Sequence, residues 1–450
     1  MNRKTFLENI ERYITANRLM DKNSLYMTAL SGGADSVALT LALKELGYRV
    51  EAAHCNFHLR GEESDRDEQF CIALCKSKGI GIHIVHFDTA EYARLHKQSI
   101  EMAARNLRYA YFDQLRKDIG AEGICVGHHR EDSVETLLIN LTRGTGINGL
   151  TGIAPKNGYI LRPMLNVART DIEDYLRELG QPFVTDSTNL VDDVTRNKIR
   201  LNLMPIIRGI NPSADRDIAA TARRMSEAAK VFNDAMNKAV KEVTMSDSKE
   251  RTVVDIKKLE AQVSPEYTLY SVLSRFSFSP SAIEDFYEKM HSMQTGKVFA
   301  SATHRMAVDR ERIVIEPIAA GEKKTMKIPE CGTYCFSEEM KLKFAVSDID
   351  DGFQVCRAQH TATFDASLVK FPLKIRHAER GDWFVPFGMK GKKLVSDFLT
   401  DRKFSVFDKE RQLVVADAND NIIWIVGIRP DNRFRIGLKS EKALTVGIVK

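Results

Sequence analysis

The sequence comprises 450 residues, 43% of them hydrophobic and 28% charged, which favours two or three packed domains over a single core. The 66 basic and 61 acidic residues leave a net charge of +5, so the case for a polyanionic partner depends on where basic residues cluster. No apolar run approaches the length that crosses a membrane, and seven cysteines without a CxxC pair argue against a disulfide framework and for the reducing cytoplasm.

The first 20 residues mix both charge signs with apolar residues at helical spacing, which predicts a docking helix and not a signal peptide. Beyond them, short apolar runs alternate with longer helical segments. The expected strands are 25–30, 49–56, 82–87 and 123–127, and the expected helices are 36–46, 66–78, 99–117 and 131–141. This alternation predicts an α/β fold with a doubly wound parallel sheet whose ligand lies at the carboxyl ends of the strands.

Two glycines lie between the first of these strands and the helix that follows it, in the hexapeptide SGGADS. The N–H groups at a helix start favour an anion there, and glycine lets the backbone approach a phosphate closely. The loop lacks the lysine and the spacing of GxxxxGK[ST], so it is not built to grip β- and γ-phosphates for phosphoryl transfer. By itself it is equally consistent with a plain strand-to-helix corner capped by Asp35 or Ser36.

SGGADS resembles the SGG-x-DS loop of the PP-loop superfamily, the N-type ATP pyrophosphatases. Members of this superfamily cleave ATP to AMP and pyrophosphate while they adenylate a substrate oxygen. The resemblance implies that ATP binds with its pyrophosphate in this loop and that Asp35 helps to hold Mg²⁺. The residues that it implies in nucleotide binding are Ser31, Gly32, Gly33, Ala34, Asp35 and Ser36.

The segment HCNFHLRGEES, which begins at His54, follows the second expected strand. It is similar to the H-x-N-H-x-L-R motif of the tRNA(Ile)-lysidine synthetases and departs from it at Phe57, where a second histidine is usual. A single histidine is more often structural than functional, and for His54 beside this motif both interpretations stay open. The resemblance implies that Arg60 contacts tRNA.

Glu101, Arg105 and Arg108 lie at steps of four and three along the expected helix 99–117, which puts them on one face. They could form no more than exposed salt bridges, worth about 0.2–0.5 kcal/mol per pair. The segment from Glu101 to Tyr109 matches the E-x-x-AR-x-x-RY motif of the lysidine synthetases. The resemblance implies that Arg105 contacts the nucleotide or its phosphates.

The stretch 123–152 resembles the GHH-x-DDQ-x-ET-x(6)-RG-x-G-x-x-GL-x-G motif of the same family and departs from it at Glu131 and Ser133. Asp132 and Glu135 are three residues apart and therefore share a helix face. Two carboxylates there could bind an ammonium group, coordinate Mg²⁺ or accept a proton from an amine. Acids that favour the dipole of a helix start explain Glu131, but they leave the two histidines and the RGTG segment unexplained.

Three further segments resemble signatures that close the catalytic domain of the family: 162–163 resembles RP, 186–189 resembles D-x-SN with Thr188 in place of the usual serine, and 196–200 resembles RN-x-x-R. Arg196 and Arg200 lie one helical turn apart. They could face phosphate, or they could simply cover the helix with charge. The resemblance implies a catalytic role for Arg200 and tRNA binding for Arg196.

Apolar residues at helical spacing between 213 and 243 predict one long helix with a continuous buried face. That face comprises Ile218, Ala222, Met225, Ala229, Phe232, Met236 and Val240. Two further helical stretches, 264–276 and 280–291, precede a hairpin that turns at 309–312. The predicted domains are a PP-loop domain at 1–212, a mostly helical, tRNA-contacting middle domain at 213–330 and a small α+β module at 331–450.

The segment KIRHAERGDWFVPFGMKGKKLVSDFL resembles the C-terminal module of the lysidine synthetases. The resemblance implies that Lys390, Lys392 and Lys393 bind the tRNA backbone with salt-sensitive affinity. Surface lysines are common, so an unrelated acidic partner stays an alternative.

Two pairs of cysteines, 71 with 75 and 331 with 335, have a spacing of four residues. Neither pair offers enough ligands for a metal site. We expect all four to be buried small hydrophobic residues.

The family resemblance implies ATP- and Mg²⁺-dependent ligation of L-lysine to C2 of the wobble cytidine in a tRNA(Ile) with a CAU anticodon. The reaction would pass through an adenylated tRNA and release AMP and pyrophosphate. Asp132 and Glu135 would orient or deprotonate lysine, and Arg105 and Arg200 would contact base or phosphate. A tRNA thiolation enzyme of the same superfamily is the alternative, and the sequence leaves open whether two copies form a homodimer.

Overall fold

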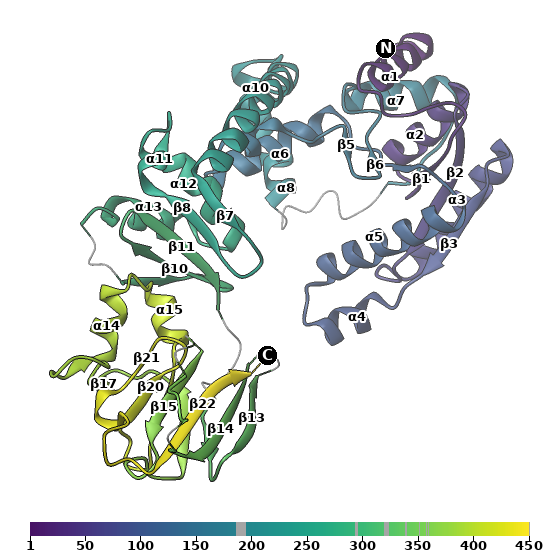
Figure 1. Ribbon diagram of the computed structural model, residues 1–450. Helices are drawn as coiled ribbons and strands as arrows, with labels where there is room; N and C mark the ends of the chain where they lie inside the picture. The colour runs from purple at the N-terminus through teal and green to yellow at the C-terminus, as the bar shows by residue number, and fades with distance from the viewer. Residues whose placement is uncertain are drawn as a thin grey trace. The chain divides into compact units, whose positions relative to one another are not determined.

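The computed structural model describes the chain except residues 186–194, 293–295, 319–323, 338–339, 351, 357, 359 and 450. The chain folds into two compact units, Met1–Asp234 and Ala235–Lys450 (Figure 1). The division falls inside α10 (Ala214–Val243). The predicted domain boundaries at 212/213 and 330/331 therefore stay predictions.

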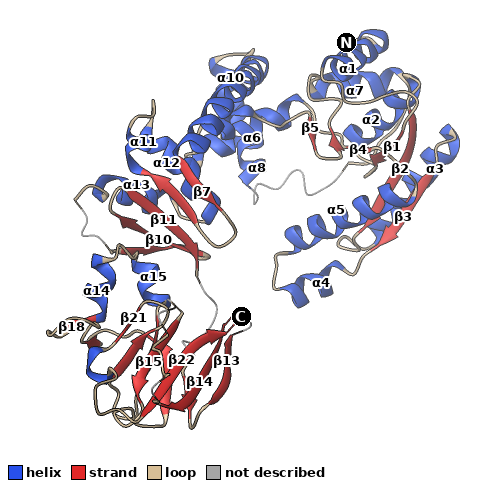
Figure 2. Ribbon diagram, in the orientation of Figure 1, coloured by secondary structure: helices blue, strands red, loops and turns tan. Residues whose placement is uncertain are grey.

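A mainly parallel sheet forms the centre of the first unit (Figure 2). Its strand order is β3-β2-β1-β4-β6-β5, and β5 pairs antiparallel with β6 at the edge. The strands are β1 (Leu25–Ala29), β2 (Arg49–Asn56), β3 (Ile82–His86), β4 (Gly123–Cys125), β5 (Lys156–Asn157) and β6 (Ile160–Leu161). The order changes direction at β1 and β4, which confirms the predicted doubly wound sheet.

Neighbouring residues of a strand point to opposite faces of the sheet, so apolar strands need cover on both faces. Helices provide this cover on each side. In β1, Tyr26 packs with residues of α1, α2, α3 and α7, whereas Met27 packs with residues of α5. The helices of this part are α1 (Arg3–Ala16), α2 (Ala34–Glu45), α3 (Glu62–Lys78), α4 (Thr89–His96), α5 (Ile100–Asp118), α6 (Arg130–Thr142) and α7 (Arg169–Glu178). The two faces form separate hydrophobic cores.

The predicted helix 66–78 begins four residues earlier than expected, at Glu62. Glu62, Glu63 and Asp65 fill its first turn, where carboxylates favour the helix dipole. The predicted start at residue 66 was wrong because acidic residues stabilise a first helical turn that shows no apolar periodicity.

After the parallel sheet, the chain continues as α8 (Thr195–Lys198), a π-helical segment (Ile199–Leu203) and α9 (Met204–Ile210). Ile199 and Met204 pack against α6 and the start of α10. The long helix α10 confirms the predicted helix, but its apolar face is not continuously buried: Ala222 and Ala229 are buried, and the other five predicted residues are half-buried.

The second unit begins with the end of α10 and a five-stranded sheet of order β7-β8-β11-β10-β9. The strands are β7 (Thr244–Asp247), β8 (Thr252–Asp255), β9 (Val298–Ala300), β10 (His304–Asp309) and β11 (Arg312–Pro317). The helices are α11 (Ile256–Glu260), α12 (Pro265–Leu273) and α13 (Pro280–Lys289). The β10–β11 pairing confirms the predicted hairpin, and the other three strands accompany helices in a region that we expected to be mostly helical.

Two larger antiparallel sheets, one two-stranded sheet and two short helices make up the rest of the described part of the second unit, as expected for an α+β module. One sheet contains β12 (Met326–Ile328), β16 (Leu373–His377), β19 (Leu413–Ala416), β20 (Ile422–Ile425) and β21 (Arg429–Pro430). The other contains β13 (Gly332–Ser337), β14 (Met340–Asp348), β15 (Thr361–Asp365) and β22 (Lys442–Val449). The helices are α14 (Val395–Asp401) and α15 (Val406–Arg411), and β17 (Trp383–Phe384) pairs with β18 (Lys393–Leu394).

The structure separates the two cysteine pairs. Cys71 and Cys75 are fully buried, as predicted. Cys331 and Cys335 are exposed, so the prediction was wrong for this pair. Cys335 lies in β13 at the edge of its sheet, where alternate side chains face outward. A search of the described residues finds no helix that is long and apolar enough to span a membrane.

Candidate active site

The SGGADS loop connects the carboxyl end of β1 with the first turn of α2. Gly32 adopts φ +90°, a conformation that other residues rarely adopt, and its carbonyl oxygen accepts a hydrogen bond of 2.9 Å from the Val184 N–H. The Ser31 backbone N–H donates to the Ser36 hydroxyl, which donates to the Gly33 carbonyl oxygen. The loop is therefore held in one shape at a helix start, where backbone N–H groups favour a bound anion.

The end of β4 lies directly against this loop. A Cβ atom on Gly127 would lie 3.0 Å from the backbone carbonyl carbon and oxygen of Asp35. Only glycine lets the two backbone segments approach so closely. This contact brings the GHH segment of the sequence next to the SGGADS loop.

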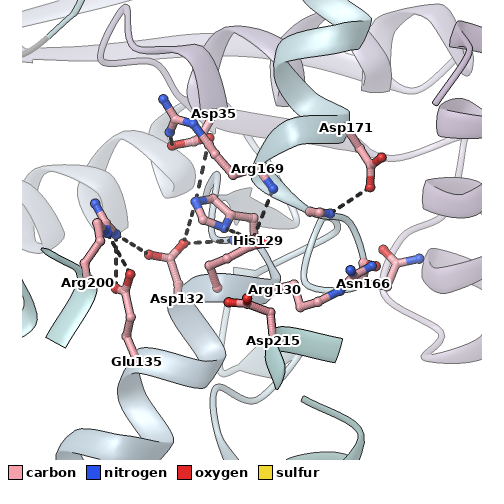
Figure 3. A network of polar contacts seen from close by, with 12 residues as sticks. Asp35, His129, Arg130, Asp132, Glu135, Asn166, Arg169, Asp171, Arg200 and Asp215 are labelled. Atoms are coloured by element: carbon pink, nitrogen blue, oxygen red, sulfur yellow. Dashed lines mark hydrogen bonds and ion pairs between the residues drawn. The ribbon is translucent and has the colours of Figure 1, made fainter. Parts of the chain in front are cut away.

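Asp35 points from the first turn of α2 toward His129 and Arg169 (Figure 3). Its Oδ2 accepts a hydrogen bond of 2.6 Å from Arg169 Nη1. Its Oδ1 is buried, has no hydrogen-bond partner among the described residues and lies 3.9 Å from His129 Nε2. Burial raises the pKa of Asp35, although the fields of His129 and Arg169 oppose this effect. A buried carboxylate oxygen without a partner is suited to a cation.

His129 lies buried among three carboxylates at the start of α6 (Figure 3). Its Nδ1 lies 2.8 Å from Glu131 Oε2, and its Nε2 lies 3.5 Å from Asp132 Oδ2. Burial opposes a charge on this ring, but the hydrogen bond to Glu131 and the fields of Asp132 and Asp35 outweigh it and raise the pKa of His129. Its backbone N–H also donates to Asp132 Oδ2 at 2.9 Å, which fixes the Asp132 carboxylate.

Arg200 pairs with both carboxylates predicted on α6 (Figure 3). Its Nε and Nη2 atoms donate to the two oxygens of Glu135 at 2.7 and 3.0 Å, and Nη2 lies 3.5 Å from Asp132 Oδ1. Arg196 Nε lies 3.7 Å from Glu135 Oε2. Burial raises the pKa of Glu135 despite its bond with Arg200. The two arginines of the RN-x-x-R segment thus face α6 and do not simply cover their helix with charge.

A cavity of about 480 Å³ opens over the SGGADS loop. Asp35 and Asp132 line it together with Arg108, Arg196 and Arg200. The loop residues in its wall are Ser31, Gly33, Asp35 and Ser36. Predicted phosphate-binding, carboxylate and cationic residues therefore share one cavity.

A second cavity of about 450 Å³ adjoins the first. Glu101 and Arg105 line this second cavity, whereas Arg108 lines both. Of the two arginines on the predicted helix face, Arg108 therefore lines the cavity over the loop and Arg105 does not. Arg108 lies 5.1 Å from the centre of the Phe57 ring, and Phe57 also lines both cavities.

His54 and Arg60 also line the second cavity. His54 is buried, and its Nδ1 lies 2.9 Å from the Leu30 carbonyl oxygen; burial lowers its pKa. Arg60 Nη2 donates to the buried Asp67 carboxylate at 3.1 Å. Both side chains therefore have structural partners and also face a space that a ligand could enter.

Two family models match this chain. Residues 3–207 match the PP-loop domain, and residues 247–318 match the TilS substrate binding domain. The tRNA(Ile)-lysidine synthase of Bacteroides thetaiotaomicron is 42% identical over 98% of this chain and 99% of its own length, and that of Parabacteroides distasonis is 43% identical over 98% and 100%. The enzyme of the same name from Porphyromonas gingivalis is 35% identical over 93% of each chain.

The chain belongs to the tRNA(Ile)-lysidine synthase family. The membership covers both compact units, since the alignments extend over nearly the whole chain. It also means that ATP is the nucleotide expected at the PP-loop of this lysidine synthase family member.

The predicted tRNA-binding lysines lie in the second unit. Lys392 Nζ lies 4.0 Å from the centre of the Trp383 ring, and Lys393 pairs with Asp401. Lys390 is exposed. The 186–189 segment of the lysidine synthase signature lies outside the described residues.

Sequence reasoning did not select Arg169, His129 or Glu131 as site residues. Arg169 lies 134 positions from its partner Asp35, and no motif used in the prediction included it. The pair of histidines at 128 and 129 was a signal that could have found His129, since the acids of the helix start left this pair unexplained.

Proposed function

We propose that this protein ligates L-lysine to C2 of the wobble cytidine of tRNA(Ile) with a CAU anticodon, using ATP and releasing AMP and pyrophosphate. The observation that supports this most directly is the single cavity that joins the SGGADS loop to Asp35, Asp132 and Arg200. A loop without a P-loop lysine suits pyrophosphate as a leaving group. The adjacent carboxylates suit an amine substrate.

Mg²⁺ fits the carboxylates of this cavity. Asp35 contributes the buried oxygen without a partner, and Asp132 Oδ2 lies 3.5 Å from the same His129 Nε2 atom that this oxygen approaches. The described residues contain no group of three metal-ligating side chains, but Mg²⁺ is commonly held by one or two carboxylates together with substrate phosphates and water. When bound there, Mg²⁺ would offset the negative charge of the departing pyrophosphate.

In the first step, the C2 oxygen of cytidine attacks the α-phosphorus of ATP. A bond forms between that oxygen and phosphorus, and the bond to the β-phosphate oxygen breaks. The N–H groups of the loop 31–36 receive the pyrophosphate, and Arg108 and Arg200 supply positive charge near the phosphoryl group. The wobble base has to leave its stack, which a single-stranded anticodon loop permits at modest cost.

In the second step, the lysine ε-amine attacks C2 and AMP leaves with the C2 oxygen. Glu135 is already bonded to Arg200 through both of its oxygens. Asp132 lines the cavity, and its contact with Arg200 is longer, at 3.5 Å. Asp132 is therefore better placed than Glu135 to orient the amine and accept its proton. Glu135 then serves to hold Arg200 in place.

We expect both units of the chain to contact the tRNA. Arg60 and Arg196 would contact it in the first unit, and Lys390, Lys392 and Lys393 would contact its backbone in the second. Residues 247–318, which match the substrate binding model, lie within the predicted middle domain 213–330. This supports a division of labour between a catalytic PP-loop domain and tRNA-binding regions.

The test combines purified protein, ATP, labelled lysine and a tRNA(Ile) transcript with the CAU anticodon. We expect lysine to enter the tRNA only when ATP is present, with AMP and pyrophosphate released. A transcript whose wobble cytidine is replaced by uridine is the matched control and should take up no lysine. Sulfur incorporation, or ADP with orthophosphate as products, would contradict the proposal.

A further inference from the structure

His128 and Arg162 form a pair that the proposed chemistry leaves unused. They follow the ends of two adjacent parallel strands, β4 and β6, which pair through Ile124 with Ile160 and Cys125 with Leu161. His128 lines the cavity over the SGGADS loop. Arg162 belongs to the RP segment at 162–163, for which the sequence suggested no chemistry.

The geometry of the pair fixes the position of the ring proton. Arg162 Nε donates a hydrogen bond of 3.1 Å to His128 Nδ1, and Arg162 Nη1 donates to the Ala154 carbonyl oxygen at 2.8 Å. A guanidinium has donors and no acceptor. His128 Nδ1 therefore accepts, and the ring is neutral with its proton on Nε2.

The surroundings keep this ring neutral. Burial lowers the pKa of His128 to about 4, and the charges of Arg162, Arg196 and His129 act in the same direction, while Asp132 opposes them. The neighbouring His129 has a raised pKa because three carboxylates surround it. The hydrogen bond from Arg162 and the low pKa of His128 therefore agree on a neutral ring.

We propose that His128 donates a hydrogen bond from Nε2 to the α-phosphoryl group of ATP and that Arg162 sets its tautomer. This inference rests on the proposed function. Among the described residues, Arg162 is the only hydrogen-bond partner of the His128 ring, so Nε2–H lacks an acceptor in a cavity built for phosphate. The α-phosphoryl group would lie between the loop that receives pyrophosphate and the Asp132 side where the amine attacks.

A neutral donor suits both steps at this phosphorus. Charge grows on the non-bridging oxygens when the C2 oxygen attacks, and it grows again when AMP leaves C2. A fixed donor stabilises that charge in both transition states. A neutral imidazole N–H is also a very weak acid, so it does not protonate the C2 oxygen or the amine that must act as nucleophiles.

Two amide substitutions separate this role from packing. The Gln side chain of His128→Gln can place an N–H donor near the position of Nε2, whereas that of His128→Asn places its amide near Nδ1. In single-turnover assays with saturating ATP and tRNA, we expect His128→Gln to form AMP-tRNA within about tenfold of the unmodified protein. We expect His128→Asn to be slower by about 10²–10³-fold, with similar KM for ATP.

Arg162→Met tests the positioning role. It should slow adenylation in the presence of His128 but have little further effect in the His128→Gln protein, which has no tautomer to set. The ¹⁵N shifts of the His128 ring should show a protonated Nε2 and an unprotonated Nδ1, and Arg162→Met should average them. This spectrum decides the matter even where His128→Asn folds poorly.

Equal adenylation rates for His128→Gln and His128→Asn would overturn the inference, as would a protonated Nδ1 in the unmodified protein. Failure of the proposed function is a separate outcome. In that case the unmodified protein itself would show no tRNA-dependent release of AMP.

Discussion

Replacement of Asp35 by asparagine should separate catalysis from folding. The side chain keeps its shape but loses the charge that would hold Mg²⁺. Its bond with Arg169 would weaken, and hydrogen bonds to charged groups contribute about 1.5–3 kcal/mol. The raised pKa of Asp35 shows that burial already disfavours its ionised form, so the neutral amide recovers part of that loss.

The free energy of unfolding should therefore fall by no more than about 1 kcal/mol, a shift in Tm of about 2–4 °C for a unit of this size. Arg169 also keeps its ion pair with Glu173 at 3.0 Å. Loss of a metal ligand should cost the chemical step several kcal/mol, because the ion stabilises the charge of the departing pyrophosphate. We expect AMP formation to fall by at least about 10³-fold, since each 1.36 kcal/mol corresponds to a factor of ten.

The assay follows AMP and pyrophosphate release over a Mg²⁺ titration, and thermal melting is recorded in parallel. Asp118→Asn, which removes an exposed carboxylate bonded to Gln114 on α5, is the matched control and should leave both measurements unchanged. If Asp35→Asn retained AMP formation with the same Mg²⁺ dependence, the metal role of Asp35 would be refuted.

Three further predictions concern the second unit. Charge reversal at Lys392 and Lys393 should weaken tRNA binding and flatten its salt dependence, whereas reversal at the exposed Lys439 should not; an unchanged slope would remove the pair from the interface. Glu316→Leu should lower the free energy of unfolding by about 1.5–3 kcal/mol in urea titrations, because the buried Glu316 carboxylate accepts bonds from Arg251 and Arg411, which would keep only their bonds with Asp408. Burial opposes ionisation of Asp408, but arginine and serine hydrogen bonds outweigh it and lower its pKa from 3.8 to about 2, so its stabilising contribution is present above pH 3.8 and is lost as the pH falls toward 2. The urea midpoint should fall over that range, and less so in Asp408→Asn.

The parallel sheet could be predicted because its strands are apolar and its helices periodic. The expected strand 49–56 has the bounds of β2, and the expected helix 99–117 differs from α5 by one residue at each end. The sheet that contains β7, β8, β11, β10 and β9 was harder to predict. β7 is mostly exposed, β9 has three residues, and neither shows the alternation that marks a half-buried strand.

The candidate site could be predicted where its residues lie close together in sequence. Asp132 and Glu135 share the face of α6, as their spacing required. The partners supplied by distant segments could not be predicted: neither the Arg169 contact with Asp35 nor the choice between Arg105 and Arg108 follows from a local pattern. Such contacts depend on how β1, β4 and the helices pack in three dimensions, and the local spacing of residues does not determine that packing.

The pairing of charges in this site suggests which contacts change when substrates bind. Arg200 holds Glu135 through two short hydrogen bonds and touches Asp132 only at 3.5 Å. An incoming lysine ammonium at Asp132 would therefore replace the weaker contact and leave the stronger pair intact. Because Arg200 would keep its position near the phosphoryl group while lysine binds, substitution of Asp132 should raise the KM for lysine more than substitution of Glu135, which should lower the rate of adenylation.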